Sequence, residues 1–366
     1  MSGLSIFCLV IFGIQVIYLS LFLFAFLKER KPGSEQPKPV SVIVCAHDEE
    51  DNLRELVPLL LAQDHPEFEV IIVEDRCNDA TYDYLLAETK LDNRLKMVRV
   101  NHKPEHITGK KFALTLGIKA AKYDWVLLTD ADCRPTGNSW VAGMSAEMDE
   151  RTQIVLGYSP YIKAKGLLNA FIRFESFLTG IQFIGLAILG KPFMGVGRNL
   201  AYRRSLFLDN KGFNNHLGVI GGDDDLFVNQ HAVGATTKTC IGVEVLMKSV
   251  PKTTWQEYYL QKLRHLSVGK YYKFSDRLVL GAFSLSWVLM WLAILPISFF
   301  SPLMYWVWGV FLLRWIILIV LFHHAARKLG EPFEAWKAPF LDFIYAFYYL
   351  VTGLMALVSK KVRWKN

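Results

Sequence analysis

The chain has 366 residues, of which 52% are hydrophobic and 14% aromatic, and its mean hydropathy is positive. These values exclude a wholly water-soluble protein of this length, so we expect part of the chain to face lipid. The formal charge of +7 comes from scattered Lys and Arg residues and not from one basic arm. This excludes nucleic acid as the expected partner and favours membrane-facing loops and a phosphorylated substrate.

The first predicted element is a transmembrane anchor over residues 1–27. This run is almost uncharged until Lys28, Glu29 and Arg30, and roughly 20 apolar residues suffice for a helix to cross a bilayer. The basic residues follow the apolar run instead of preceding it. The pattern therefore predicts an uncleaved anchor whose C-terminal end lies in the cytoplasm. Residues 28–39 follow as a polar, Pro-rich linker.

An alternation of short apolar runs and helical stretches begins at Val40. The runs read as buried parallel strands at Val40–Ala46, Glu69–Asp75, Leu95–Val100 and Trp125–Asp130. Apolar residues at helical spacing predict helices at Glu49–Ala62 and Lys111–Ala121. This alternation predicts an α/β fold with a doubly wound, Rossmann-like sheet, in which ligands bind at the carboxyl ends of the strands.

The C-terminal part of the chain is dominated by apolar blocks. Gly166–Leu189 is broken by charges and glycines, so we expect a helix at the membrane surface and not a span. Leu278–Phe300 and Pro302–Phe322 are predicted spans, joined by a tight turn at Ser301–Pro302. Phe340–Val358 is followed by a basic tail, so it either spans the membrane or is re-entrant or interfacial.

Arg314 lies near the middle of the second predicted span. A charge at the centre of a span costs roughly 2.5 to 3.5 kcal/mol on insertion scales, and this position is too deep for the side chain to reach the surface fully. Arg314 is therefore expected to face the protein interior. Two hypotheses follow: it pairs with Asp342 and holds the helices together, or it binds the head group of a lipid acceptor.

Two acidic motifs carry the chemistry. The sequence TDAD, Thr129–Asp132, places two carboxylates one residue apart at the end of a predicted buried strand. A hard divalent cation, Mg²⁺ or Mn²⁺, takes carboxylate oxygens and bridges the two phosphates of a substrate. In GGDDDLF, Gly221–Phe227, adjacent carboxylates raise one another's proton affinity, which suits a general base, although Asp residues there can also cap a helix.

Taken in order, the motifs from Val40 to Tyr272 resemble those of the membrane-embedded glycosyltransferases of family 2, which have the GT-A fold. The motifs are VSVIVCAHDEEDNL from residue 40, VEDRCNDAT from 73, GKKFALTLGI from 109, TDAD from 129, GVGRNLAYRRSLF from 195, GGDDDLF from 221 and QKLRH from 261. Arg76 and Cys77 stand where the family usually has Gly-Ser, and His265 stands where it has Trp.

The resemblance implies roles for residues on the donor side. Asp75 would bind the uracil edge of the nucleotide, and Asp79 would brace its loop. Lys110 would meet the nucleotide or its phosphates. Asp132 would be the closer metal ligand, and Asp130 would also bind the metal while lying nearer the sugar and ribose of the donor.

The resemblance also implies a base and an acceptor side. Asp223 would be the catalytic base that removes the acceptor proton in an inverting transfer. Gln261 and Arg264 would share one helical face, and Arg264 would grip the diphosphate with its planar fork of donors. The residues expected on the acceptor side are Gly197, Asn199 and Asp224.

The expected protein has a GT-A domain over residues 40–272, including interfacial helices, and a membrane region of two or three hydrophobic helices over 273–366. It would be a multi-pass protein of the cell (inner or plasma) membrane with its catalytic domain in the cytoplasm. The expected reaction is an inverting, metal-dependent transfer of a sugar from a nucleoside diphosphate sugar, a UDP-sugar, to a lipid or lipid-linked acceptor.

Two alternatives stay open at this point. The first is a processive polysaccharide synthase that extends a glycan, which the absence of Trp at position 265 disfavours. The second is a non-catalytic membrane scaffold that binds nucleotide. Retention of the acidic motifs together with Arg264 argues against the second alternative.

Overall fold

The computed structural model describes residues 3–28, 36–300 and 304–358. The predicted turn at Ser301–Pro302 and the basic tail after residue 358 lie outside the described residues. The chain divides into two compact units. The sheet unit comprises residues 30–162 and 186–251, and the helical unit comprises residues 1–29, 163–185 and 252–366. Each unit is described by itself.

The sheet unit contains a mixed sheet of seven strands in the order β3-β2-β1-β4-β7-β6-β8, and a small ladder of β5 with β9. The strands are β1 Val40–Ala46, β2 Phe68–Asp75, β3 Leu95–Val100, β4 Trp125–Asp130, β5 Cys133–Pro135, β6 Ile154–Gly157, β7 Leu200–Arg203, β8 Thr237–Cys240 and β9 Met247–Ser249. The strands β3, β2, β1 and β4 are parallel, whereas β7 runs antiparallel to both β4 and β6.

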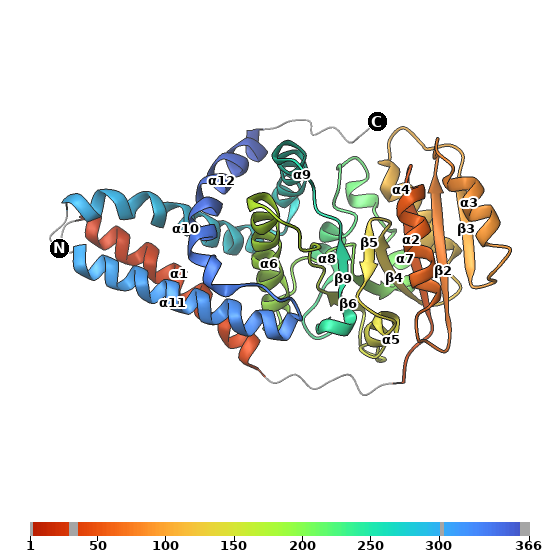
Figure 1. Cartoon of the computed structure of the whole chain (residues 1–366), viewed down its shortest axis with the longest axis horizontal. Helices are drawn as coiled ribbons and strands as arrows, with labels where there is room; N and C mark the ends of the chain where they lie inside the picture. The colour runs from red at the N-terminus through yellow and green to blue at the C-terminus, as the bar shows by residue number, and fades with distance from the viewer. Residues whose placement is uncertain (1–2, 29–35, 301–303, 359–366) are drawn as a thin grey trace. The chain divides into compact units, whose positions relative to one another are not determined.

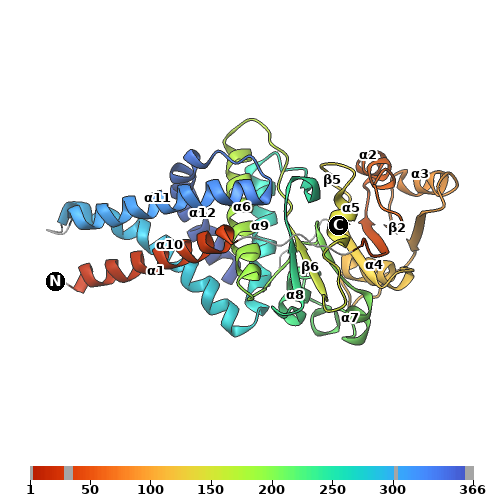
Figure 2. The same cartoon turned by 90° about the horizontal axis from the view of Figure 1, so that it is seen from below.

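Helices cover both faces of this sheet. They are α2 Glu50–Leu61, α3 Thr81–Glu88, α4 Gly109–Ala120, α5 Trp140–Ser145, α7 Arg204–Asp209 and α8 Asp225–His231, with 3-10 turns η1 Asn214–His216 and η2 Val243–Val245. Side chains alternate along β1, so Val42 and Val44 belong to the same core cluster as Leu56 of α2. Ile43 faces the other way, because a Cβ at Gly117 of α4 would lie 2.8 Å from its side chain. Figure 2 shows α2 and α4 on either side of β2.

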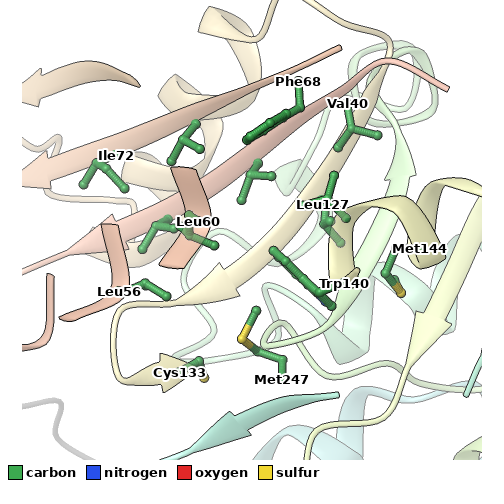
Figure 3. Packing of buried hydrophobic residues seen from close by; sticks show 14 of the residues in the cluster. Val40, Leu56, Leu60, Phe68, Ile72, Leu127, Cys133, Trp140, Met144 and Met247 are labelled. Atoms are coloured by element: carbon green, nitrogen blue, oxygen red, sulfur yellow. The ribbon is translucent and has the colours of Figure 1, made fainter. Parts of the chain in front are cut away.

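The core on the α2 face is continuous across strands and helices that are far apart in the sequence. Figure 3 shows Trp140 of α5 among Leu127 of β4, Met144 and Met247 of β9. The Trp140 side chain is fully buried, and its ring N–H donates to Oδ1 of Asn199 at 2.9 Å. Because the buried indole N–H has an acceptor, this large side chain fills the core without an unpaired polar atom.

The predicted α/β fold is confirmed, and the predicted strands Val40–Ala46, Leu95–Val100 and Trp125–Asp130 have the predicted bounds. The second strand begins one residue earlier, at Phe68. The strands β6, β7 and β8 were not predicted, because each is only four residues long and carries no distinctive periodicity.

The helical unit is formed by long apolar helices. They are α1 Gly3–Leu27, α6 Leu167–Ile188, α9 Trp255–Val268, α10 Phe274–Phe300, α11 Met304–Leu329 and α12 Ala338–Val358, with 3-10 turns η3 Gly269–Tyr271 and η4 Ala335–Lys337; the last residues of α6 fall in the sheet unit. Within the described residues, five helices (all of these except α9) are long and apolar enough to cross a membrane. Figure 1 shows α1, α10 and α11 side by side, and Phe12 of α1 contacts Phe311 of α11 edge to face.

The charges that interrupt α6 are buried within the helical unit. Arg173 is paired with Glu331 at 3.1 Å, and Glu175 accepts from the hydroxyl of Tyr258 at 2.8 Å and from Lys262. Arg173 therefore binds the segment that follows α11, and Glu175 binds α9, both in the same unit. The prediction that α6 lies at the membrane surface stays a prediction.

Arg314 lies in α11 and is fully buried, as is Asp342 of α12. Its guanidinium forms two hydrogen bonds with the Asp342 carboxylate, Nη1 to Oδ2 at 2.7 Å and Nη2 to Oδ1 at 3.0 Å. The guanidinium also lies 4.5 Å from the ring centroid of Trp287 in α10, and Trp315 donates to Asp342. Of the two hypotheses from the sequence, the structure shows the pairing, which links α11 to α12.

We expect Arg314→Leu and Asp342→Leu each to lower the free energy of unfolding by about 3 to 5 kcal/mol, because each change leaves one buried charge without its partner. The double variant should recover part of the loss, because no unpaired charge remains in it. Thermal unfolding of the four proteins in one detergent measures this coupling. The exposed Arg277 of α10 offers a control, Arg277→Leu, and losses that simply add in the double variant would contradict the pairing.

Candidate active site

The carboxyl ends of β1, β2 and β4 meet at one edge of the sheet. In the ladder, Cys45 of β1 lies opposite Val73 of β2 on one side and opposite Asp130 of β4 on the other. Asp75 is the last residue of β2, and Asp130 is the last residue of β4. The sheet therefore brings two of the predicted donor-side residues to the edge where doubly wound folds bind ligands.

The Asp75 carboxylate is almost fully buried and is held by its neighbour, Arg76. Arg76 donates from Nε to Oδ1 at 2.8 Å and from Nη2 to Oδ2 at 3.2 Å. The backbone of Arg76 has φ +56°, a left-handed conformation that suits glycine. This chain thus makes the turn with an arginine, whose side chain folds back onto the Asp75 carboxylate. This carboxylate is predicted to bind the uracil base of the nucleotide.

Asp79 connects the beginnings of two helices. Its Oδ2 accepts from the backbone N–H of Glu50 and its Oδ1 from that of Thr81, both at 3.1 Å. In the described part of the chain, Asp48, Cys77 and Asp79 have possible metal-ligand atoms within 4.8 Å of one another. Their polar atoms already bind backbone N–H groups of this loop, including that of Asn78 to Asp48 at 2.6 Å. We therefore interpret these three residues as a hydrogen-bonded group that stabilises the loop, and not as a metal centre.

Lys110, in the first turn of α4, lies between the two acidic motifs. Its Nζ is 2.9 Å from Oδ1 of Asp130 and 3.3 Å from Oδ2 of Asp223. Burial alone lowers the pKa of this ammonium, but the carboxylates of Asp130, Asp223 and Asp224 outweigh it and raise the pKa well above its usual range. Lys110 thus joins the TDAD motif to the GGDDD motif as an ammonium group.

Asp132 lies between the end of β4 and the beginning of β5. Its carbonyl accepts from the N–H of Val250 at 3.1 Å, which connects this turn to the end of β9. Asp130 and Asp132 supply oxygen donors one residue apart, at the same edge of the sheet as Asp75. This donor set fits Mg²⁺ or Mn²⁺, which prefer carboxylate oxygens, and does not resemble a thiolate or imidazole site.

The three adjacent aspartates of the GGDDD motif have different partners. Asp223 contacts Lys110, as described. Asp224 is the N-cap of α8 and accepts from the N–H of Asp225 at 2.8 Å and from the N–H of Gly197 at 2.6 Å. Burial and the charge of Asp223 raise the pKa of Asp224. Asp225 is also buried and accepts from the N–H of Leu226 at 2.7 Å.

Asn199, predicted on the acceptor side, is fully buried and saturated with protein partners. Its Oδ1 accepts from Trp140, and its Nδ2 donates to the carbonyls of Tyr158 at 2.8 Å and Val245 at 2.9 Å. Its amide therefore crosslinks α5, η2 and the residue that directly follows β6. Gly197, two residues before it, contacts Asp224 and keeps its place near the acidic loop.

Gln261 and Arg264 lie on α9, at i and i+3 as predicted. This helix belongs to the helical unit, whereas the carboxylates of the site belong to the sheet unit. The part of both residues in binding the diphosphate stays a prediction.

Lys111 is a site residue that the sequence reasoning missed. It is buried, and its Nζ donates to the carbonyls of His216 at 2.6 Å and Val219 at 2.8 Å, in the loop that leads to Asp223. The sequence pattern could have indicated its burial, because Lys111 lies at helical spacing from Leu114 and Ile118 on the buried face of α4.

Burial lowers the pKa of Lys111 to about 8, against an ordinary value of 10.5. Below pH 8 the lysine is protonated in both folded and unfolded chains. Between about 8 and 10.5 the unfolded chain binds the extra proton, so this residue makes stability rise with pH in that window. A neutral amine can still donate to both carbonyls, so the loop keeps its anchor.

We therefore expect the advantage of wild type over Lys111→Met in Tm to be larger at pH 9.5 than at pH 7.5. Differential scanning fluorimetry of both proteins at the two pH values measures it. Lys119→Met, which changes an exposed lysine of the same helix, serves as the control and should show no such change with pH. An advantage for Lys111 that stays constant or shrinks at pH 9.5 would contradict the assigned pKa.

Three comparisons place this geometry among known proteins. Residues 41–209 match the family model described as glycosyl transferase family 2. The chain is similar to a poly-beta-1,6-N-acetyl-D-glucosamine synthase of Staphylococcus epidermidis, with 30% identity over 102 residues, which cover 28% of this chain and 24% of the relative. An uncharacterized glycosyltransferase of Haemophilus influenzae is 27% identical over 145 residues, 39% of this chain and 41% of that protein.

These matches span about a quarter to two fifths of the length of the relatives. Among solved structures, the chain resembles the mannosyltransferase PcManGT from Pyrobaculum calidifontis, in complex with GDP-Man and Mn²⁺. The TM-score is 0.65 with 17% identity, and the alignment covers 98% of this chain and 99% of that one. At this level of identity the resemblance supports the fold.

Proposed function

We propose a reaction for this protein on the premise that it is a glycosyltransferase of family 2. It transfers a sugar from a nucleoside diphosphate sugar to a hydroxyl group of a lipid or lipid-linked acceptor, with inversion at the anomeric carbon. The observation that carries this proposal is the contact of Lys110 with both Asp130 and Asp223, because it brings the cation-binding and acidic-loop motifs into one site.

Asp223 is the base of this reaction. It takes the proton of the acceptor hydroxyl while that oxygen forms a bond to the anomeric carbon, and the bond from this carbon to the diphosphate oxygen breaks with its electron pair on the diphosphate. Asp223 is nearly buried, and Lys110 fixes its carboxylate, so the base is positioned before the acceptor binds. Asp224 keeps the loop of Asp223 against Gly197.

Asp132 and Asp130 hold a divalent cation, Mg²⁺ or Mn²⁺. When bound, such a cation neutralises the charge that develops on the leaving diphosphate. Lys110 adds a positive charge beside Asp130, which also favours the departure of the negatively charged diphosphate. The presence of Mn²⁺ in the Pyrobaculum structure supports this assignment.

The donor is a UDP-sugar in this proposal, and Asp75 accepts from the uracil edge. Asp75 is paired with Arg76 in the structure, so binding of uracil requires the Asp75 carboxylate to share or exchange this partner. Asp79 braces the loop that carries both residues. A panel of UDP- and GDP-sugars, assayed with the purified protein and membrane lipid extracts, tests both the transfer reaction and the preference for uracil over guanine in the donor.

The membrane is the site of this reaction. The five apolar helices in the described residues support a multi-pass protein of the cell membrane. The basic residues that follow the first apolar run, Lys28 and Arg30, support a cytoplasmic location for the domain that carries Asp223. Gln261 and Arg264 of α9 contact the diphosphate. His265, in the place of the Trp of the related polymer-forming enzymes, favours single additions over processive synthesis.

Asp132→Asn should reduce transfer at least about a hundredfold, because the cation loses a charged oxygen ligand. Saturating EDTA should do the same to the wild-type protein, and added Mn²⁺ or Mg²⁺ should restore it. The measurement is the release of nucleoside diphosphate from the donor. Full activity in saturating EDTA would exclude the role of the metal.

Asp223→Asn should abolish transfer while the dissociation constant of the donor changes by no more than a few fold, because the base acts on the acceptor in the transition state. Calorimetric titration with UDP and turnover measurements separate the two effects. Asp209→Asn, an exposed position at the end of α7, is the matched control. A parallel loss of UDP binding and turnover would make Asp223 a donor-binding or structural residue instead.

A further inference from the structure

Arg198 is a charged residue of the acceptor-side motif to which neither the sequence nor the proposed reaction assigns a role. The residues on both sides of it are fixed. Gly197 donates its N–H to Oδ2 of Asp224 at 2.6 Å, and Asn199 donates to the carbonyls of Tyr158 and Val245. The backbone at Arg198 is therefore held in place by the acidic loop on one side and by the core on the other.

The side chain of Arg198 is stacked, but its hydrogen-bonding capacity is not used up. The guanidinium carbon lies 4.6 Å from the centroid of the Tyr161 ring. This cation–π contact uses the face of the guanidinium and leaves its N–H edges available. Nη1 is buried and has no hydrogen-bond partner among the described residues. A buried charged donor without an acceptor is costly, so it indicates an acceptor that arrives with a ligand.

The charges around Arg198 indicate where that ligand lies. Burial alone lowers the pKa of Arg198, but Tyr161, Cys133, Asp130 and Asp132 outweigh it and raise the pKa overall, so the guanidinium stays charged. These neighbours include both carboxylates that are assigned to the cation. Arg198 is thus within electrostatic range of both proposed cation ligands, and its neighbour Gly197 is bound to the acidic loop through Asp224.

We propose that Arg198 binds a phosphoryl oxygen of the substrate, either of the donor diphosphate or of the phosphate of a lipid-linked acceptor. This inference rests on the proposed function and deepens it. Phosphate oxygens match the planar fork of a guanidinium, which can donate two parallel hydrogen bonds. Arg198 belongs to the sheet unit, like Asp130 and Asp132, so its contribution does not depend on that of Arg264 in the helical unit.

The test compares Arg198→Gln and Arg198→Lys with wild type in the full-length protein in detergent. We expect Arg198→Gln to weaken UDP binding by roughly tenfold to a hundredfold in the presence of Mn²⁺, while uridine binding is unchanged. Arg198→Lys keeps the charge without the fork and should lose less. Arg151→Gln, which removes an exposed arginine of the same unit, is the control and should bind UDP as wild type does.

Binding of dihexanoyl phosphatidic acid, a soluble phosphomonoester lipid, separates the two sources of phosphate. Weaker binding of this lipid with unchanged UDP binding assigns Arg198 to the acceptor phosphate. The Tm without ligand should be unchanged or higher in Arg198→Gln, because the change replaces a charged donor that has no acceptor by a neutral amide. UDP and lipid binding that are both unchanged, or a large drop in this Tm with uridine binding lost as well, would overturn the inference.

The failure of this inference is distinguishable from the failure of the proposed function. A wild-type protein that binds UDP while Arg198→Gln binds it equally well, together with unchanged lipid binding, overturns only the role of Arg198. A wild-type protein that binds neither UDP nor GDP with Mn²⁺ overturns the proposed transfer, and the inference with it.

Discussion

The two ion pairs of Lys110 are the constraint on which the candidate site depends. One ammonium group holds Asp130 at the end of β4 and Asp223 in the loop before α8, at 2.9 and 3.3 Å. Without this cation, two carboxylates would repel each other at the buried edge of the sheet. Because Asp224 follows Asp223 directly and binds the N–H of Gly197, the position of the acceptor-side motif also depends on this pairing.

Two consecutive lysines in the first turn of α4 position the end of β4 and the acidic loop. Successive residues of a helix point about 100° apart, so Lys110 reaches the carboxylates while Lys111 reaches the carbonyls of His216 and Val219. One helix end therefore fixes both the end of β4 and the acidic loop. The helix is in turn held against the sheet by Gly117, where a Cβ would lie 2.8 Å from the side chains of Ile43 and Val73.

In the helical unit, too, buried charged side chains are paired with side chains of opposite charge. Arg314 and Asp342 are both fully buried, and each compensates the charge of the other with two hydrogen bonds. Arg173 and Glu331 repeat this arrangement where α6 packs within the unit. Arg314 and Arg173 thus have protein acceptors, whereas Nη1 of Arg198 is the one buried arginine nitrogen in the described residues that has none.

The sequence by itself determined the parallel strands, the strand-end carboxylates and the inward orientation of Arg314, with Asp342 as one of two candidate partners; the structure decided for Asp342. Buried strands appear as local apolar runs, and the cost of a charge within a span leaves few possible partners. Only the tertiary structure decided that Arg76 covers Asp75, that Lys110 joins two motifs, and that Asn199 is a core crosslink. The contact of Arg76 depends on its left-handed backbone, which no local pattern predicts. The other two contacts join residues far apart in the sequence, so they depend on the path of the folded chain.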